Sequence, residues 1–125
     1  MPAPFRTERS IVPEMGTFIL QVFGTITFEE APELREAIFS TLKEKGDRPL
    51  VVELAGVERM DTAGVAALLE GLIESRRQNR PYFLCGPSDS VLRIFRLAGL
   101  PDALESCCRG PEEVQEKLGR SGSRS

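Results

Sequence analysis

The chain has 125 residues, of which 41% are apolar and 28% charged, and its net charge is −3 at neutral pH. This length predicts a single domain that buries a core without disulfides or metals, and the acidic balance excludes a broad basic surface for nucleic acids. No apolar run approaches the roughly 18 residues of a membrane span and no signal segment opens the chain, so we expect a cytoplasmic protein.

The first predicted elements are two strands that form an antiparallel hairpin. Residues 5–12 alternate imperfectly between apolar and polar side chains. Residues 16–24 are rich in β-branched and aromatic side chains, and a short loop containing Pro13 separates the two segments. This arrangement is typical of a β-hairpin.

A helix is predicted over residues 28–45, because apolar residues recur there at helical spacing. These residues are Ala31, Leu34, Ile38 and Leu42. A capping box between Thr27 and Glu30 would fix the start of the helix, whereas Pro32 fits only a first turn and indicates a later start. Gly46 is expected to end the helix.

The centre of the chain predicts a strand, a helix and a second strand. Residues 49–57 and 81–86 are short apolar runs, which are typical of strands buried on both faces of a sheet. Between them an apolar stripe predicts an amphipathic helix that begins next to Asp61. The stripe consists of Val65, Leu68, Leu69, Leu72 and Ile73.

A further helix follows the second of these strands. Ser88 is expected to cap its start. Gly99 is expected to end it in a left-handed conformation, with Leu100 in contact with Phe95. The inward-facing residues would be Val91, Ile94, Phe95 and Ala98.

The end of the chain and the order of the elements complete the predicted fold. Residues 103–106 predict a short strand, and residues 111–118 predict a helix because they open with proline and two acids. Residues 119–125 carry no apolar anchor and are expected to be a disordered tail, so the single domain would span residues 5–118.

Strands that alternate with helices pair in parallel through right-handed crossovers. The sequence therefore predicts an α/β fold with a small mixed β-sheet, parallel at its centre and opened by the antiparallel hairpin.

The segment DTAG, residues 61–64, is the strongest candidate site, because it joins the central strand to a helix at the carboxyl end of the sheet. Asp61 and Thr62 are preferred helix N-caps, and a plain cap explains both. A phosphate on Thr62 would instead meet the positive end of the helix dipole and add about −1.5 to −2 charges beside Asp61. Gly64 has no Cβ and would let another backbone or a ligand approach. Spacing alone leaves the cap and the switch open.

Other charged residues are weaker candidates. Arg93 and Arg96 lie three apart on the last core helix, where they either bind an acidic partner or form a solvated face. Four acids surround the start of the first helix and are read first as helix-start chemistry. They are Glu29, Glu30, Glu33 and Glu36.

Catalysis is not expected. Histidine is absent, which excludes Ser–His and Cys–His nucleophile pairs, and no phosphate loop or metal-ligand spacing appears, so no cofactor and no metal are predicted. A carboxylate pair of Asp61 and Asp89 is the remaining enzyme hypothesis. Cys85, Cys107 and Cys108 have no disulfide pattern. The simplest interpretation is that they are small, buried, reduced residues of a cytoplasmic protein. A redox role for the adjacent residues Cys107 and Cys108 stays open.

Three segments in this order resemble the STAS domain family over roughly residues 15–108. They are an apolar strand that ends at Gly24 and leads into a helix, the stretch VVELAGVERMDTAGVAALLEGL, and the stretch FLCGPSDSVLRIFRLAGLPDAL. The second stretch contains the family's motif D-[ST]-x-G between a strand and an amphipathic helix. The resemblance implies a STAS fold with its helices mainly on one side of the sheet and no catalysis of its own.

The chain resembles the anti-sigma factor antagonists of this family. In these, the hydroxyl residue after the Asp is phosphorylated by a partner that is both a serine kinase and an anti-sigma factor. The unphosphorylated form binds that partner and frees the sigma factor, and a phosphatase resets the cycle. The resemblance assigns phosphorylation to Thr62, which replaces the more usual Ser, and gives Asp61 a role in phosphotransfer geometry and partner contact. It assigns partner binding to Asp61, Thr62, Ala63, Gly64, Val65 and Leu68.

The chain departs from the antagonists at one further position, and a second branch of the family offers an alternative. Thr27 stands where the antagonists often have an acid. Small STAS proteins that bind the ATPase subunit of Mla-type phospholipid ABC transporters often carry an Asp-Thr motif like the DTAG of this chain, and their threonine supports ATPase binding. The resemblance favours the anti-sigma factor antagonist and keeps the transporter adaptor as the alternative. A monomer and a weak homodimer through the edge of the opening hairpin both remain open.

Overall fold

The structure, a computed structural model, describes residues 4–12, 16–44, 48–99, 107, 108, 113, 114 and 116. Within these residues no helix combines the length and the apolar character that crossing a membrane requires. The predicted helix over residues 111–118 is described only in part, and the predicted tail at residues 119–125 lies outside the described residues.

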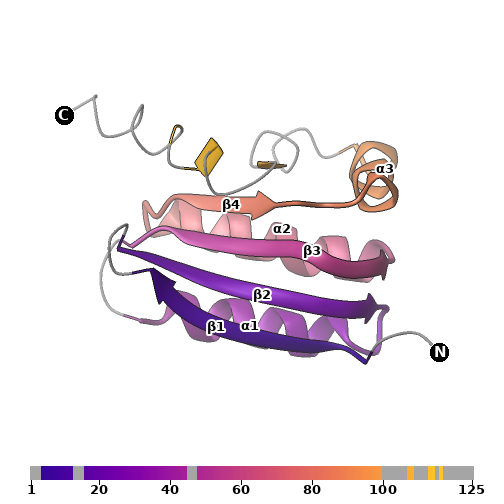
Figure 1. The fold of residues 1–125 in the computed structure, drawn as a ribbon, viewed down its shortest axis with the longest axis horizontal. Helices are drawn as coiled ribbons and strands as arrows, with labels where there is room; N and C mark the ends of the chain where they lie inside the picture. The colour runs from indigo at the N-terminus through magenta and orange to yellow at the C-terminus, as the bar shows by residue number, and fades with distance from the viewer. Residues whose placement is uncertain are drawn as a thin grey trace.

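The described strands form one mixed sheet in the order β1-β2-β3-β4-β5 (Figure 1). The hairpin of β1 and β2 is antiparallel, and each later strand adds in parallel to the one before it. The mixed sheet predicted from the sequence is therefore confirmed. The strands are β1 (Arg6–Val12), β2 (Thr17–Ile26), β3 (Leu50–Met60), β4 (Tyr82–Cys85) and β5 (Cys107–Cys108).

The strands β1 to β4 begin and end within three residues of their predicted bounds, and β2, for example, ends at Ile26 rather than at Gly24. The central strand β3 continues to Met60, three residues beyond the predicted end at Val57, because its carboxyl half still pairs with β2 as far as Ile26. The short strand predicted at residues 103–106 lies outside the described residues, and the structure describes the edge strand as Cys107–Cys108.

The helices are α1 (Ala31–Leu42), α2 (Thr62–Arg77) and α3 (Asp89–Leu97). In Figure 1, α1 and α2 lie behind the sheet, and α3 stands at the end where β2 and β3 finish. One apolar cluster contains side chains from these helices and from a single face of β2, β3 and β4. The helices therefore cover one face of the sheet, as expected. The four predicted apolar residues of α1 are all buried, and Leu34, Ile38 and Leu42 belong to this cluster.

The opposite face of the sheet carries a second, smaller cluster. It consists of Val51, Phe83, Cys85, Cys108 and Val114, with Ile19 packed against it. The prediction that the central strand is buried on both faces is right for Leu50, Val51 and Val52, but Ala55 near the carboxyl end is exposed.

The buried face of α2 lies further round the helix than its sequence indicates. Ile73, predicted to face the core, is 60% exposed. The reason is the small residue Gly71, on which a Cβ would lie 2.7 Å from Cγ2 of Ile38 and 2.8 Å from the hydroxyl of Tyr82. Because small residues let α1 and β4 approach here, α2 turns this side inward and Ile73 outward.

The starts of α1 and α3 can be compared with the capping predicted from the sequence. The backbone N–H of Thr27 donates to the Glu30 carboxylate, which is half of the predicted capping box, but α1 begins only at Ala31, with Pro32 in its first turn. The Ser88 hydroxyl caps α3 as predicted by accepting from the Val91 N–H at 3.3 Å.

Beyond the last turn of α3, Gly99 adopts φ +66° as predicted. Ala98 is exposed rather than inward-facing, because it follows the last helical residue. The expected stop at Gly46 and the contact of Leu100 lie outside the described residues.

Candidate functional site

The site begins where β2 and β3 end side by side. Ile26 and Met60 are register partners, and the backbone N–H of Asp61 donates to the Ile26 carbonyl at 3.0 Å. The turn from β2 into α1 and the junction from β3 into α2 therefore meet at the carboxyl edge of the sheet. This is the edge at which open α/β folds usually bind ligands and partners.

Asp61 is the residue that ties these two connections together. Its Oδ1 accepts from the backbone N–H groups of Ala63 at 2.9 Å and Gly64 at 3.3 Å, which makes it the N-cap of α2. Its Oδ2 accepts from the backbone N–H of Phe28, 33 residues earlier in the chain, at 3.1 Å. The cap predicted from the sequence is confirmed, and the same carboxylate also holds the turn before α1.

Thr62 is the first residue of α2, and its side chain is exposed. Within the described part of the chain, no residue hydrogen-bonds its hydroxyl. The hydroxyl lies at the positive end of the α2 dipole, where an added anion is favoured. It is therefore accessible to a modifying enzyme or to a partner.

The other predicted contact residues lie deeper. Gly64 is buried, and a Cβ on it would lie 2.6 Å from Cγ of Met60 and 3.0 Å from Cγ2 of Ile26. The space that Gly64 leaves is filled by the chain's own sheet, which corrects the expectation that it receives another molecule. Ala63 is half-buried and stands closer to the surface.

Val65 and Leu68 are core residues of α2. They are only 2% and 1% exposed and pack with the helices against the sheet. In this structure they hold the orientation of α2, and they offer no surface of their own.

Phe28 lies next to this site, and the sequence reasoning did not single it out. Its side chain is 71% exposed, although it is a large aromatic residue in a turn that Asp61 holds. A signal was present in the sequence, because a phenylalanine directly before two glutamates does not fit the predicted apolar stripe of α1. Nothing local, however, indicated its link to Asp61.

The remaining charged candidates are scattered rather than gathered at one point. Arg93 and Arg96 are exposed on α3, as expected for a solvated face or for a partner contact. Asp89 is exposed in the first turn of α3. Both oxygens of Asp61 accept backbone N–H groups, so Asp61 serves as a capping carboxylate and not as half of a free pair with Asp89.

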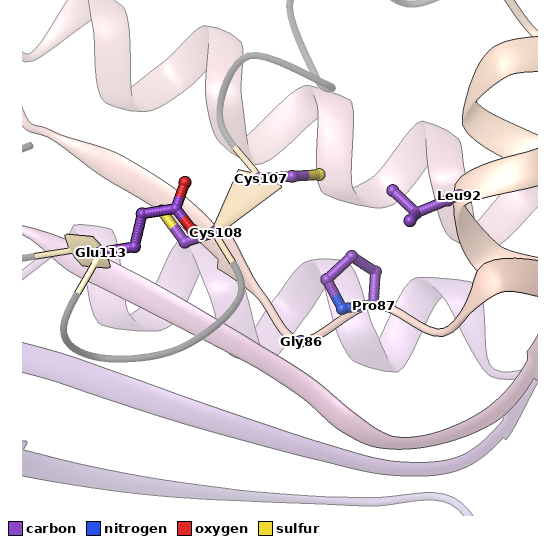
Figure 2. A pocket seen from close by; sticks show the side chains of 6 residues that line it. All are labelled: Gly86, Pro87, Leu92, Cys107, Cys108 and Glu113. Atoms are coloured by element: carbon purple, nitrogen blue, oxygen red, sulfur yellow. The ribbon is translucent and has the colours of Figure 1, made fainter.

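Cys107 and Cys108 line a cavity of about 350 Å³ beside β4 and β5 (Figure 2). Its described lining residues are Gly86, Pro87, Leu92, Cys107, Cys108 and Glu113. Burial, together with the neighbouring Cys108, raises the pKa of the Cys85 thiol to about 12, so this thiol stays protonated at neutral pH. Among the described residues, no group of three or more His, Cys, Asp or Glu side chains is placed to hold a metal ion.

Known proteins resemble this chain over most of its length. The sequence profile of the STAS domain matches residues 9–117. The anti-sigma-B factor antagonist of Staphylococcus aureus (strain NCTC 8325 / PS 47) is 30% identical over 86 residues, which make up 68% of this chain and 78% of that protein.

Solved structures share the fold. The anti-sigma factor antagonist SpoIIAA in its unphosphorylated form matches with a TM-score of 0.70 at 18% identity, over 94% of this chain and 97% of SpoIIAA. The phosphorylated form of the Bacillus cell fate determinant SpoIIAA matches with a TM-score of 0.66 at 17% identity, over 92% and 99% of the two chains.

Proposed function

The chain belongs to the STAS domain family, and from this premise we propose that it acts as an anti-sigma factor antagonist. It would bind an anti-sigma factor that is also a serine kinase, through the surface around Asp61 and Thr62, without catalysis of its own. Phosphorylation of Thr62 would release the partner, and a phosphatase would restore binding. The domain would span residues 5–118.

The observation that carries this proposal is the exposed hydroxyl of Thr62 directly after the capping carboxylate of Asp61. A kinase would transfer the γ-phosphoryl group of ATP to the Thr62 oxygen, with ADP as the leaving group, and a base of the kinase would accept the hydroxyl proton. The phosphate would bring about −1.5 to −2 charges next to the Asp61 carboxylate, at the centre of the docking surface. Like charges that a partner must desolvate weaken binding, so one modification would be enough to separate the complex.

The partner-binding role divides between exposed and buried residues. Asp61, Thr62 and Ala63 would contact the partner, because their side chains are exposed or half-buried. Gly64, Val65 and Leu68 would act beneath them by fixing the first turns of α2 against the sheet.

A second candidate function is the adaptor of an Mla-type phospholipid ABC transporter, in which the same surface would bind the ATPase subunit. It is favoured by the threonine at position 62 followed by Ala63. A β-branched threonine is stiffer than the serine usual in antagonists, which suits a permanent contact as well as a switch.

The test is affinity capture from extract of the source organism, followed by binding and phosphorylation assays with the purified captured protein. Thr62→Glu should lower the affinity for an anti-sigma factor kinase at least about tenfold, because charge enters the interface. Thr62→Ala should accept no phosphate.

Ser40→Glu is the matched control, since Ser40 is exposed on α1 far along the chain from the site, and it should bind as the unmodified chain does. Capture of an ABC transporter ATPase would replace the antagonist proposal by the adaptor. Equal affinity of Thr62→Glu and the unmodified chain would overturn the role of Thr62.

A further inference from the structure

We propose that Phe28 is the aromatic anchor of the docking surface, that Asp61 positions it, and that the partner presents an apolar pocket rimmed by Lys or Arg. This inference rests on the proposed function and adds the chemistry of its interface. The Phe28 surface is defined as Phe28, Glu29, Asp61 and Thr62.

The exposure of Phe28 is the first observation. Phe28 is 71% exposed, whereas Phe95 is completely buried in the core. Removing a phenyl ring from water is favourable, and aromatic anchors of this kind carry much of the binding free energy of protein interfaces. A partner pocket that receives the Phe28 ring would gain this free energy.

The rigidity of the turn is the second observation. Each backbone N–H from Thr27 to Glu30 has an acceptor: the Glu30 carboxylate, Asp61 Oδ2, the Thr27 hydroxyl and the Thr27 carbonyl, in chain order. The Thr27 hydroxyl also donates to the Glu30 carboxylate at 2.8 Å. A turn with every N–H satisfied holds Phe28 in place before the partner arrives, which lowers the entropic cost of binding.

The connection to Thr62 is the third observation. The Asp61 carboxylate reaches the Phe28 N–H with one oxygen and the start of α2 with the other. The backbone that carries the exposed ring is therefore held next to the start of α2, which carries the exposed hydroxyl of Thr62, by a single side chain. A partner that contacts Thr62 meets Phe28 on the same edge of the sheet.

Charge indicates the chemistry of the partner. Glu29 follows Phe28 directly and is exposed, Glu33 is exposed in the first turn of α1, and Asp61 adds a half-buried carboxylate. Basic residues on the partner would be attracted by all three carboxylates and would steer its approach to this surface. In this interface Thr62 would lie against the apolar pocket beside the anchor and not against the basic rim, so a phosphate on Thr62 would have to lose its hydration without a charged partner and would weaken binding.

The probe is the purified anti-sigma factor kinase obtained from the capture experiment, titrated by calorimetry with the full-length chain. Phe28→Ala should weaken binding about 10- to 30-fold, as for an interface hot spot, and Phe28→Trp, which keeps an aromatic ring, should restore most of it. Leu97→Ala is the control, because Leu97 is 77% exposed on α3 and lies outside the Phe28 surface. It should bind as the unmodified chain does.

Asp61→Asn tests the positioning role. Asparagine caps helices as well as aspartate does, but its single acceptor oxygen cannot serve both α2 and the Phe28 N–H. Its loss of affinity should overlap in part with that of Phe28→Ala, so that the double variant loses less than the sum of the two single losses, and the remainder measures the direct contact of Asp61 with the partner. Fully additive losses would overturn the positioning role of Asp61.

The outcomes separate the inference from the proposed function. If the unmodified chain binds the kinase and Phe28→Ala binds equally well, the anchor is wrong while the antagonist proposal stands. If the unmodified chain binds no anti-sigma factor kinase, the proposed function and the anchor are both overturned. A Glu29→Gln, Glu33→Gln variant whose affinity depends on salt as strongly as that of the unmodified chain would overturn the basic rim.

Discussion

The two ends of the parallel strands use hydrogen bonds to opposite effect. At the carboxyl end, Asp61 satisfies backbone N–H groups from α2 and from the preceding turn, and the side chains of Phe28 and Thr62 are left exposed. At the amino end, Arg80 is only 4% exposed. It donates to the carbonyls of Leu42 and Arg48 at 2.8 and 3.1 Å.

The difference indicates that the amino end of the parallel strands stabilises the fold, whereas the carboxyl end is available for binding a partner. A single charged side chain gathers backbone groups from distant segments at each end, but Arg80 closes the end of α1 onto the sheet and presents nothing outward. Carbonyls at a helix C-terminus favour a cation, just as N–H groups at a helix N-terminus favour an anion. We therefore expect substitutions at the amino end to change the free energy of unfolding and substitutions at the carboxyl end to change binding.

Arg80→Met should produce the largest loss of stability. It leaves the carbonyls of Leu42, Glu44 and Arg48 without their shared donor, and the free energy of unfolding should fall by about 2–4 kcal/mol. Urea denaturation followed by circular dichroism measures it. Arg93→Met removes the same charge from an exposed site and should change stability by less than about 0.5 kcal/mol. Equal losses of stability for the two variants would show that the hydrogen bonds of Arg80 do not stabilise the amino end of the sheet.

Gly64→Ala should follow, because it tests the packing directly beneath the exposed site. The new methyl group would meet Met60 at 2.6 Å, and such overpacking lowers the free energy of unfolding by about 1–3 kcal/mol. Gly99→Ala is the control, since Gly99 has open space around it and only its φ of +66° is strained by a side chain. A smaller loss at Gly64 than at Gly99 would contradict the tight packing under α2.

High pH should sharpen the comparison along β4, which places Tyr82 at the amino end and Cys85 at the carboxyl end. Burial raises the pKa of both groups, so the folded state keeps their protons more tightly than the unfolded chain does. Stability is then unchanged at neutral pH and falls as the pH rises above the ordinary values of 9.0 for the thiol and 10.0 for the phenol.

Tyr82→Phe isolates the phenol. It should flatten the fall above pH 10, by at most about 1.4 kcal/mol per pH unit, while losing the hydrogen bond to the Leu68 carbonyl. Urea midpoints measured from pH 8 to pH 11 provide the test. An alkaline slope that is the same with and without the hydroxyl would show that folding does not raise the pKa of Tyr82.

The comparison also explains which features could be predicted from the sequence. Capping by Asp61 and Ser88 acts over two or three residues, and the apolar spacing of α1 is local, so these predictions were right. The bonds from Asp61 to Phe28 and from Arg80 to Leu42 join residues 33 and 38 positions apart. Such tertiary contacts leave no local pattern, and both the exposed anchor and the closed end were therefore missed.

Phe28→Ala should have the smallest effect on stability and gives the sharpest test of the division. Because its ring is 71% exposed, truncation should change the free energy of unfolding by less than about 0.5 kcal/mol. Phe95→Ala removes the same ring from a fully buried position and should cost about 3–5 kcal/mol. If urea denaturation instead showed a loss above about 1 kcal/mol for Phe28→Ala, the ring would be supporting its own turn. The carboxyl end would then resemble the amino end, because its side chains would stabilise the fold rather than bind a partner.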